Sequence, residues 1–374
     1  MAIKAALSGF LALLVAMGIG RFAFTPQVPL MIGAGQLTLT GAGVVATCNY
    51  LGYLLGAFDA MRSANGLEKR LWIGLWGAVA LTLLSAQTHS LLAHGLLRLL
   101  IGAASGWAMV LVAAWTNDRL VQLRRPALGA AVFAGPGAGI LASGLLALVM
   151  HRLGVNVADA WLVYGVTALV LVAAISPHLP RGGELTRRGP RDAMPALTPA
   201  LKNLVWSYSL AGFGYILPAT FLAQMAAARF PGSETGHWVW PVFGAASMAG
   251  IGVGILTRHC LSAGKRLALT LWAQTIGVVL MIAMPGVGGL MTGALLTGGG
   301  FLSVVQLTLV CARRQAPDHM RYMAGLLTCG YALGQLAGPM LSSLASALTG
   351  RLEPALVAAA AALALAGALV WRQP

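Results

Sequence analysis

Long apolar runs follow one another along this sequence, and short segments between them hold most of the charged residues. A run of about 17 to 25 apolar residues forms a helix long enough to cross the hydrocarbon layer of a bilayer, which is roughly 30 Å thick. The chain is 58% hydrophobic and only 9% charged, which excludes an ordinary soluble domain. Twelve spans are predicted: Ala5–Ile32, Gly41–Met61, Leu71–Ala86, Leu91–Trp115, Leu128–Met150, Ala158–Ile175, Leu204–Ala228, Val239–Leu256, Leu267–Met284, Gly289–Cys311, Ala324–Leu348 and Ala355–Trp371.

The basic residues predict how these spans are oriented. The formal net charge of +15 would suit nucleic acid only if the Lys and Arg residues gathered on one soluble face. They lie instead in short clusters between the runs. With both termini in the cytoplasm, nineteen fall in cytoplasmic segments and three in outside loops. We therefore expect a multi-pass protein of the bacterial inner membrane with cytoplasmic termini and no nucleic-acid partner.

The two halves of the chain repeat each other. Residues 177–203 are hydrophilic and are predicted to link an N-terminal six-helix bundle, 1–176, to a C-terminal one, 204–374. Because six spans separate the copies, both share one orientation, as in the parallel repeats of many transporters. Motifs recur in chain order at offsets of 194 to 203 residues: Gly18-Ile19-Gly20-Arg21 with Gly212-Phe213-Gly214-Tyr215, Gly52 and Gly56 with Gly250 and Gly254, Lys69-Arg70 with Lys265-Arg266, and Gly135-Pro136 with Gly338-Pro339.

Several motifs resemble one transporter family. GIGRFAFTPQVPLM, from Gly18 to Met31, followed by NYLGYLLGAF, from Asn49 to Phe58, resembles the opening of the YbfB/YjiJ-type transporters of the major facilitator superfamily. The run from Arg98 to Gly106 resembles the superfamily's RxxxGxxxG element in the fourth helix. The resemblance implies an all-α membrane protein of the major facilitator fold, with twelve helices in two pseudo-symmetric six-helix bundles. It also implies a permease that works by alternating access, in which the two halves rock about a mid-membrane cavity.

The loop after the second span departs from the family pattern GxxxDRxGRR. Its elements, Gly56, Asp59, Arg62, Lys69 and Arg70, are spread over fifteen positions here. The resemblance implies a cytoplasmic gate at Asp59 and Arg62. Gly135-Pro136, which resembles the Gly-Pro element of the fifth helix, and Gly338-Pro339 are predicted to bend the fifth and eleventh spans so that the halves can pivot.

Arg21 lies near the middle of the first predicted span, where a charge costs at least about 2.5 to 3.5 kcal/mol unless it is partnered or hydrated. It must therefore face protein or a cavity. One hypothesis is that its guanidinium binds a carboxylate, sulfonate or phosphate of the solute, with Thr25 one turn further on the same face. The alternative is a structural role, in which Arg21 bonds helix carbonyls across the bundle.

Other residues complete the predicted sites. Asn49 and Tyr53 lie one turn apart in the second span. The first, fourth, seventh and tenth helices line the cavity in this fold, so the resemblance makes Trp107, Tyr215 and Gln306 candidate solute contacts, with packing or lipid contact as the alternative.

Two further residues in the fourth span are candidates for gating or coupling. Arg98 has either that role or a structural one. His94, one turn earlier, either carries a proton or is a solvated histidine at the membrane surface.

The acidic residues favour one class of solute. All nine lie at span ends or in loops, whereas a carrier of cations normally keeps a carboxylate at mid-membrane. We expect a small organic solute that is anionic or zwitterionic, moved by a monomer, with protons as a possible coupling ion. Alternatives are broad-specificity drug efflux, copper import through His319 and Met323 at i+4, and a non-transporting sensor on the same fold. No enzyme motif, metal site or cofactor site is predicted.

Overall fold

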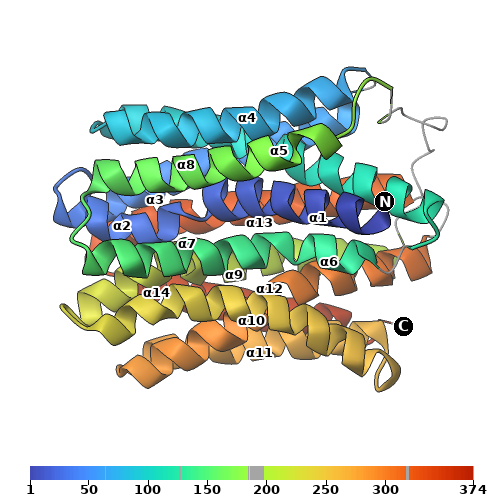
Figure 1. Ribbon diagram of the computed structural model, residues 1–374. Coiled ribbons are helices and arrows are strands. Elements are labelled where there is room, and N and C mark those ends of the chain that lie inside the picture. The colour runs from blue at the N-terminus through green and yellow to red at the C-terminus, as the bar shows by residue number, and fades with distance from the viewer. Residues whose placement is uncertain (64, 126–127, 184, 186–197, 317–319, 374) are drawn as a thin grey trace. The chain divides into compact units, whose positions relative to one another are not determined.

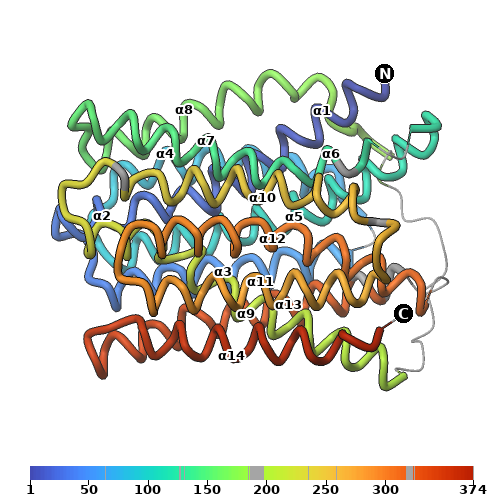
Figure 2. The backbone as a smooth tube through the Cα atoms, turned by 90° about the horizontal axis from the view of Figure 1, so that it is seen from below, coloured from blue at the N-terminus to red at the C-terminus, as the bar shows by residue number. Residues whose placement is uncertain are grey.

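The computed structural model describes residues 1–63, 65–125, 128–183, 185, 198–316 and 320–373. Every regular element within these residues is a helix, which confirms the all-α prediction. The chain divides into two compact units, Met1–Arg188 and Gly189–Pro374, which are described separately. Within each unit the long helices run side by side (Figures 1 and 2).

Unit 1 begins with a helical rod made of three consecutive segments, and several of its other long helices pack against that rod (Figure 1). The fifth predicted span is divided into a short and a long helix. The elements of unit 1 are α1 (Ala2–Leu13), the π-helix η1 (Leu14–Arg21), α2 (Phe24–Gly33), α3 (Leu39–Arg62), α4 (Leu67–Leu84), η2 (Ser85–Gln87), α5 (Leu91–Gln122), α6 (Gly129–Phe133), α7 (Gly135–Arg152), α8 (Val157–Ile175) and η4 (Ser176–His178).

Unit 2 contains longer uninterrupted helices, joined by short 3-10 turns and loops. Pro218 and Pro339 lie inside two of these helices without ending them. The elements of unit 2 are α9 (Pro199–Arg229), η5 (Glu234–Trp238), α10 (Val239–Leu256), η6 (Thr257–His259), α11 (Ala263–Ala283), α12 (Val287–Gln315), α13 (Met320–Thr349) and α14 (Glu353–Val370).

Helices lie at all twelve predicted spans, and ten helical segments in the described part of the chain are long and apolar enough to cross a membrane. The third and eleventh predicted spans, α4 and α13, are helical but are not among those ten. The first turn of α4 carries Glu68, Lys69 and Arg70, which lowers its hydropathy. The chain is therefore a multi-pass membrane protein by composition and helix length, and twelve crossings stay a prediction.

Local sequence signals explain where several helices begin. Short polar side chains accept a hydrogen bond from a backbone N–H in the first turn, which satisfies donors that have no partner inside the helix. Thr38 caps α3 in this way, with 3.0 Å between its Oγ1 and the Gly41 nitrogen. Ser90 caps α5 and Asn156 caps α8 by the same kind of bond. In unit 2, Thr198 and Ser262 cap α9 and α11.

Glycines bring α3 and α5 into backbone contact in unit 1. A Cβ atom added at Gly52 or Gly56 on α3 would overlap the carbonyl oxygen of Leu99 or Ala103 on α5. Gly102 and Gly106 on α5 face α3 carbonyl oxygens in the same manner. Small residues at such spacing let the backbones of two membrane helices approach closely. This close packing holds the helices together, since lipid offers no hydrophobic force to do so. We call this contact the α3–α5 seam.

Candidate functional site

The first span changes its helical register before it reaches Arg21. Between α1 and α2 the chain forms the π-helix η1, and the Phe22 N–H donates to the Met17 carbonyl oxygen five residues earlier, at 2.9 Å. Gly18 lies in η1 directly against Gly139 of α7, where a Cβ on either residue would overlap the other. Short π segments inside helices are frequent at functional sites, because they redirect the side chains that follow. Arg21 is the last residue of η1.

Arg21 is 3% exposed and lies among aromatic rings. Its guanidinium carbon is 4.0 Å from the ring centroid of Tyr53 and 4.6 Å from that of Tyr50, both on α3, and 5.2 Å from that of Phe22. These three residues form what we call the aromatic cage. Cation–π contacts of this kind hold a guanidinium in a dry site and are worth about 2 kcal/mol when desolvated. The structure therefore brings together Arg21 and Tyr53, two of the predicted solute contacts, and adds Tyr50 to them.

Three buried polar side chains come from the segments next to Arg21. Two lie on α2, which follows Arg21 in sequence, and one lies on α3, which carries Tyr50 and Tyr53. Thr25, on α2, is 3% exposed. Asn49 donates its side-chain N–H to the Arg98 carbonyl oxygen at 2.9 Å, so it bonds α3 to α5 across the seam. Gln27, also on α2, was not among the predicted residues. It is 2% exposed, and its Nε2 has no hydrogen-bond partner among the described residues.

Arg98 connects three helices of unit 1. Its Nη1 donates to the Gly20 carbonyl oxygen at 2.8 Å, and its guanidinium carbon is 4.5 Å from the Trp161 ring centroid on α8. Gly20 lies next to the break between η1, which ends at Arg21, and α2, which begins at Phe24. Ser105 makes a similar bond to the Ala16 carbonyl oxygen at 2.7 Å. Two side chains of α5 thus donate hydrogen bonds to backbone carbonyl oxygens of η1. This arrangement favours the structural alternative for Arg98.

His94 is 1% exposed, so it is not a solvated residue at the membrane surface. Its Nδ1 lies 3.3 Å from the hydroxyl oxygen of Thr88, in the turn before α5. Positions 94 and 98 are four residues apart, so His94 lies on the same buried face of α5 as Arg98.

Asp59 gathers three donors at the end of α3. Its carboxylate accepts from Arg70 Nε at 2.7 Å, from the Trp107 indole N–H at 2.8 Å and from the Ser63 hydroxyl at 3.2 Å. Arg70 lies at the start of α4 and Trp107 on α5, so this Asp59 cluster ties three helices together. Trp107 was expected to contact the solute, but its indole nitrogen is engaged here. Asp59 and Trp107 are 48 residues apart, so no local sequence pattern predicts that they pair.

Arg62, which was assigned to the same gate, lies three residues after Asp59 on α3. Its guanidinium carbon is 5.3 Å from the Phe58 ring centroid, and Arg70 holds the carboxylate instead.

The two Gly-Pro pairs behave differently. α6 ends at Phe133, and α7 begins at Gly135 with Pro136 in its first turn, so the helix is interrupted there. Pro339 lies inside the continuous helix α13, one residue after Gly338.

Tyr215 of α9 is buried in a stack of rings in unit 2. It stacks on Phe301 of α12 at 4.7 Å and on Tyr331 of α13 at 5.5 Å between ring centroids, and Tyr331 stacks on Tyr208 at 4.3 Å. Gln335 of α13, which was not predicted, donates its amide to the Tyr215 hydroxyl. Tyr215 corresponds to Arg21 in the repeat, so an aromatic stack in unit 2 stands where unit 1 has a cation.

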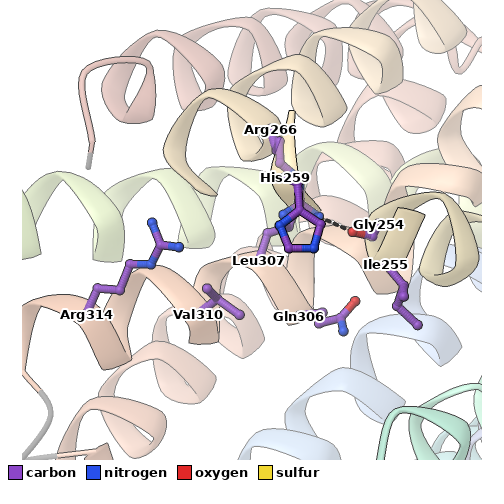
Figure 3. A pocket seen from close by; sticks show the side chains of 8 residues that line it. All are labelled: Gly254, Ile255, His259, Arg266, Gln306, Leu307, Val310 and Arg314. Atoms are coloured by element: carbon purple, nitrogen blue, oxygen red, sulfur yellow. Dashed lines mark hydrogen bonds between the residues drawn. The ribbon is translucent and has the colours of Figure 1, made fainter. Parts of the chain in front are cut away.

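Gln306 and the proposed copper pair are the predicted residues not yet described. Gln306 of α12 lines a cavity in unit 2 together with Arg266 and Arg314 (Figure 3). His319, of the proposed copper pair, lies outside the described residues, and Met323 is buried in α13. Among the residues that the structure describes, no group of three or more His, Cys, Asp or Glu side chains could hold a metal ion.

Comparison with known proteins supports the architecture. Two crystal structures of the nucleoside transporter NupG resemble the chain, each covering 98% of both chains: a point mutant with a TM-score of 0.72 and 14% identity, and NupG itself with 0.70 and 12%. At these identities the likeness shows the fold alone. No curated protein sequence matches the chain. The family model described as "Uncharacterised MFS-type transporter YbfB" matches residues 13–371. The chain therefore belongs to the YbfB family of MFS-type transporters.

Proposed function

We propose that this transporter moves a small organic solute with a negatively charged group, and that Arg21 binds that group. The observation that carries the proposal is the burial of Arg21 in the aromatic cage, at the end of a π-helix in a membrane span. Aromatic rings attract a guanidinium without neutralising it, so the cage keeps a positive potential in a dry site. A solute carboxylate or phosphate would meet the planar, permanently charged fork there.

The distribution of acidic residues supports an anionic or zwitterionic solute over a cation. Binding a cation in the apolar middle of a bundle normally requires a carboxylate, and the Asp and Glu residues of this chain lie at span ends or in loops. Thr25 and Asn49 add polar groups near the cage, and Gln27 contributes an amide whose Nε2 is buried without a described partner. These groups suit the uncharged part of a polar solute.

Alternating access supplies the mechanism, by family membership. The two repeat halves would rock about the solute, and the Asp59 cluster would act as a latch that breaks when the cytoplasmic side opens. The interruption at Gly135 and Pro136 gives unit 1 a place to bend. The proposed topology has twelve spans, both termini in the cytoplasm and the linker 177–203 on the same side, as the distribution of Lys and Arg indicates. Proton coupling and a monomeric state belong to the same proposal.

The test is a thermal-shift screen of the purified protein against organic anions, amino acids, nucleosides and drugs. A ligand that binds only the folded state raises its melting temperature. We expect hits among organic anions, and Arg21→Ala should remove the shift while the protein still folds. Lys4→Gln is the matched control, because it removes one charge from the exposed face of the same helical rod. A set of anionic hits that Arg21→Ala leaves unchanged contradicts the assignment of the site.

A second candidate solute is a neutral aromatic heterocycle such as a nucleoside. The fold of NupG and the stack of Tyr208, Tyr331, Tyr215 and Phe301 in unit 2 support it, since flat rings bind by stacking. The same screen separates the two candidates. Nucleoside hits that depend on Tyr215 and are insensitive to Arg21→Ala would favour this second solute over the anion.

A further inference from the structure

Unit 2 contains a cavity at the end of the bundle where α12 carries Arg313 and Arg314 (Figure 3). Its volume is about 440 Å³, within the range of roughly 300 to 1,000 Å³ of small-ligand sites. Three elements supply the polar part of its wall: His259 from η6, Arg266 from α11, and Gln306 and Arg314 from α12. Gly254, Ile255, Leu307 and Val310 complete the lining. This cavity lies wholly within unit 2, and its argument does not depend on Arg21.

The repeat shows why the cavity exists. Gly250 of α10 corresponds to Gly52, and a Cβ at either one would overlap a carbonyl oxygen of the facing helix. One turn later the two units differ. A Cβ at Gly56 would overlap the Ala103 backbone, whereas a Cβ at Gly254 would meet only side-chain atoms, the nearest being Gln306 Oε1 at 3.6 Å. The helices α10 and α12 therefore separate where α3 and α5 stay closed.

The residues that fill this place in unit 1 are changed in unit 2. At the offset of 198 that relates the glycines, Asp59 corresponds to Thr257, whose hydroxyl donates to the Val253 carbonyl of its own helix. The facing helices are related by an offset of 200, since Leu99 and Gly299 make equivalent contacts, so Trp107 corresponds to Leu307. Unit 2 thus lacks both the carboxylate and the large indole of the Asp59 cluster.

The cation of that cluster is kept. Arg266 corresponds to Arg70, and its Nη2 donates to the Gly254 carbonyl oxygen at the edge of the cavity (Figure 3). Its Nε is buried and has no hydrogen-bond partner among the described residues. Arg70 uses the same atom to bind Asp59. Neither Arg266 nor Arg314 forms an ion pair with a carboxylate within the described part of the chain.

We propose that the cavity binds a phosphate group, which takes the place of the carboxylate that unit 1 supplies from its own chain. A phosphate presents several oxygens around a tetrahedral centre, so it can accept from two guanidinium groups, an imidazole and an amide that arrive from different helices. The adjoining Ile255 and Val310 are exposed apolar residues that can cover the carbon part of the ligand. The phosphate belongs either to a phospholipid headgroup or to a soluble phosphate ester.

The experiment measures the melting temperature of the full-length protein in a neutral detergent. One arm adds glycerol 3-phosphate, with glycerol as its phosphate-free control, and the other adds phosphatidylglycerol, with diacylglycerol as its control. We expect stabilisation by the phosphate compound in at least one arm. A response in the first arm alone identifies a soluble ester, a response in the second alone identifies a lipid, and a response in both identifies the phosphate as the shared determinant. Stabilisation in neither arm overturns the proposal.

Substitutions test whether the stabilisation by phosphate compounds arises from binding in this cavity. Arg314→Gln and Arg266→Gln should each raise the half-saturating concentration about tenfold, because each removes a charge-assisted bond to the phosphate. Arg313→Gln is the matched control: it removes an equal charge from the neighbouring exposed position, which does not line the cavity. Equal responses of Arg314→Gln and Arg313→Gln would refute the site even if Arg266→Gln failed to fold.

A carboxylate restored at the position of Asp59 gives a second, independent test. Thr257→Asp should stabilise the protein without added phosphate and should abolish the phosphate response. A full response in this variant contradicts the claim that the ligand replaces a missing carboxylate. Arg21→Ala should keep the response, so failure of the solute-binding proposal and failure of this one are distinguishable.

Discussion

The α3–α5 seam keeps Asp59 on α3 within hydrogen-bond distance of Trp107 on α5. It also positions α3, the helix that carries Tyr50 and Tyr53. Gly52→Ala is the smallest change that tests it. The added methyl group would overlap the Leu99 carbonyl oxygen and would lie 3.0 Å from the Ala103 nitrogen. Both are backbone atoms of α5, which cannot move away as a flexible side chain can. The two helices must therefore separate along the seam.

The expected cost follows from three contributions. Overpacking of a closed contact costs about 1 to 3 kcal/mol. Separation of the helices also stretches the hydrogen bond from Asn49 to the Arg98 carbonyl, worth about 1 kcal/mol. Against these, alanine stabilises a helix interior by about 0.5 to 1 kcal/mol relative to glycine. The net effect is a destabilisation of about 1 to 3.5 kcal/mol.

The assay is thermal unfolding of the purified protein. The readout is the fraction of the monodisperse peak that remains in size-exclusion chromatography after heating to each temperature. Gly77→Ala is the control, because Gly77 lies inside α4 with no atom within 4 Å of a Cβ at that position. We expect Gly52→Ala to melt several degrees below the wild type and Gly77→Ala to melt at or above it. Equal melting temperatures for the two variants would refute the close-packing argument.

Three further predictions concern the clusters and the topology. Asp59→Asn should cost about 0.5 to 1 kcal/mol, because the ion pair with Arg70 is partly exposed, and the melting temperature should fall slightly. Tyr53→Leu should weaken stabilisation by the anionic ligands of Arg21 several-fold by removing a ring at 4.0 Å, whereas Tyr53→Phe should keep it; equal losses would exclude the cation–π contact. Cys260 is exposed and should react, in intact cells of a variant with no other cysteine, only with a maleimide that crosses the membrane. Labelling by an impermeant maleimide would contradict the predicted orientation.

The site residues show how far sequence reasoning reached. Arg21 is a candidate because a charge inside an apolar run is rare and costly, and Asp59 is a candidate through the family pattern. The partner of Asp59 was not found, because Arg70 and Trp107 reach it from other helices across 11 and 48 residues. The π-helix η1 has no signature that a hydropathy pattern can carry, since it depends on how α1 and α7 pack through Gly18 and Gly139.

The sequence by itself determined the helical class, the positions of the long helices, the recurring motifs and the family. Hydropathy and helix length are local properties matched to the thickness of the bilayer, so they can be read along the chain. Only the tertiary structure decided which helices touch, and with that the cage around Arg21, the bond from Arg98 to an irregular backbone, and the cavity beside Arg266. These depend on whether a glycine meets a carbonyl or an open space, and Gly56 and Gly254, the same residue in equivalent positions, meet different surroundings.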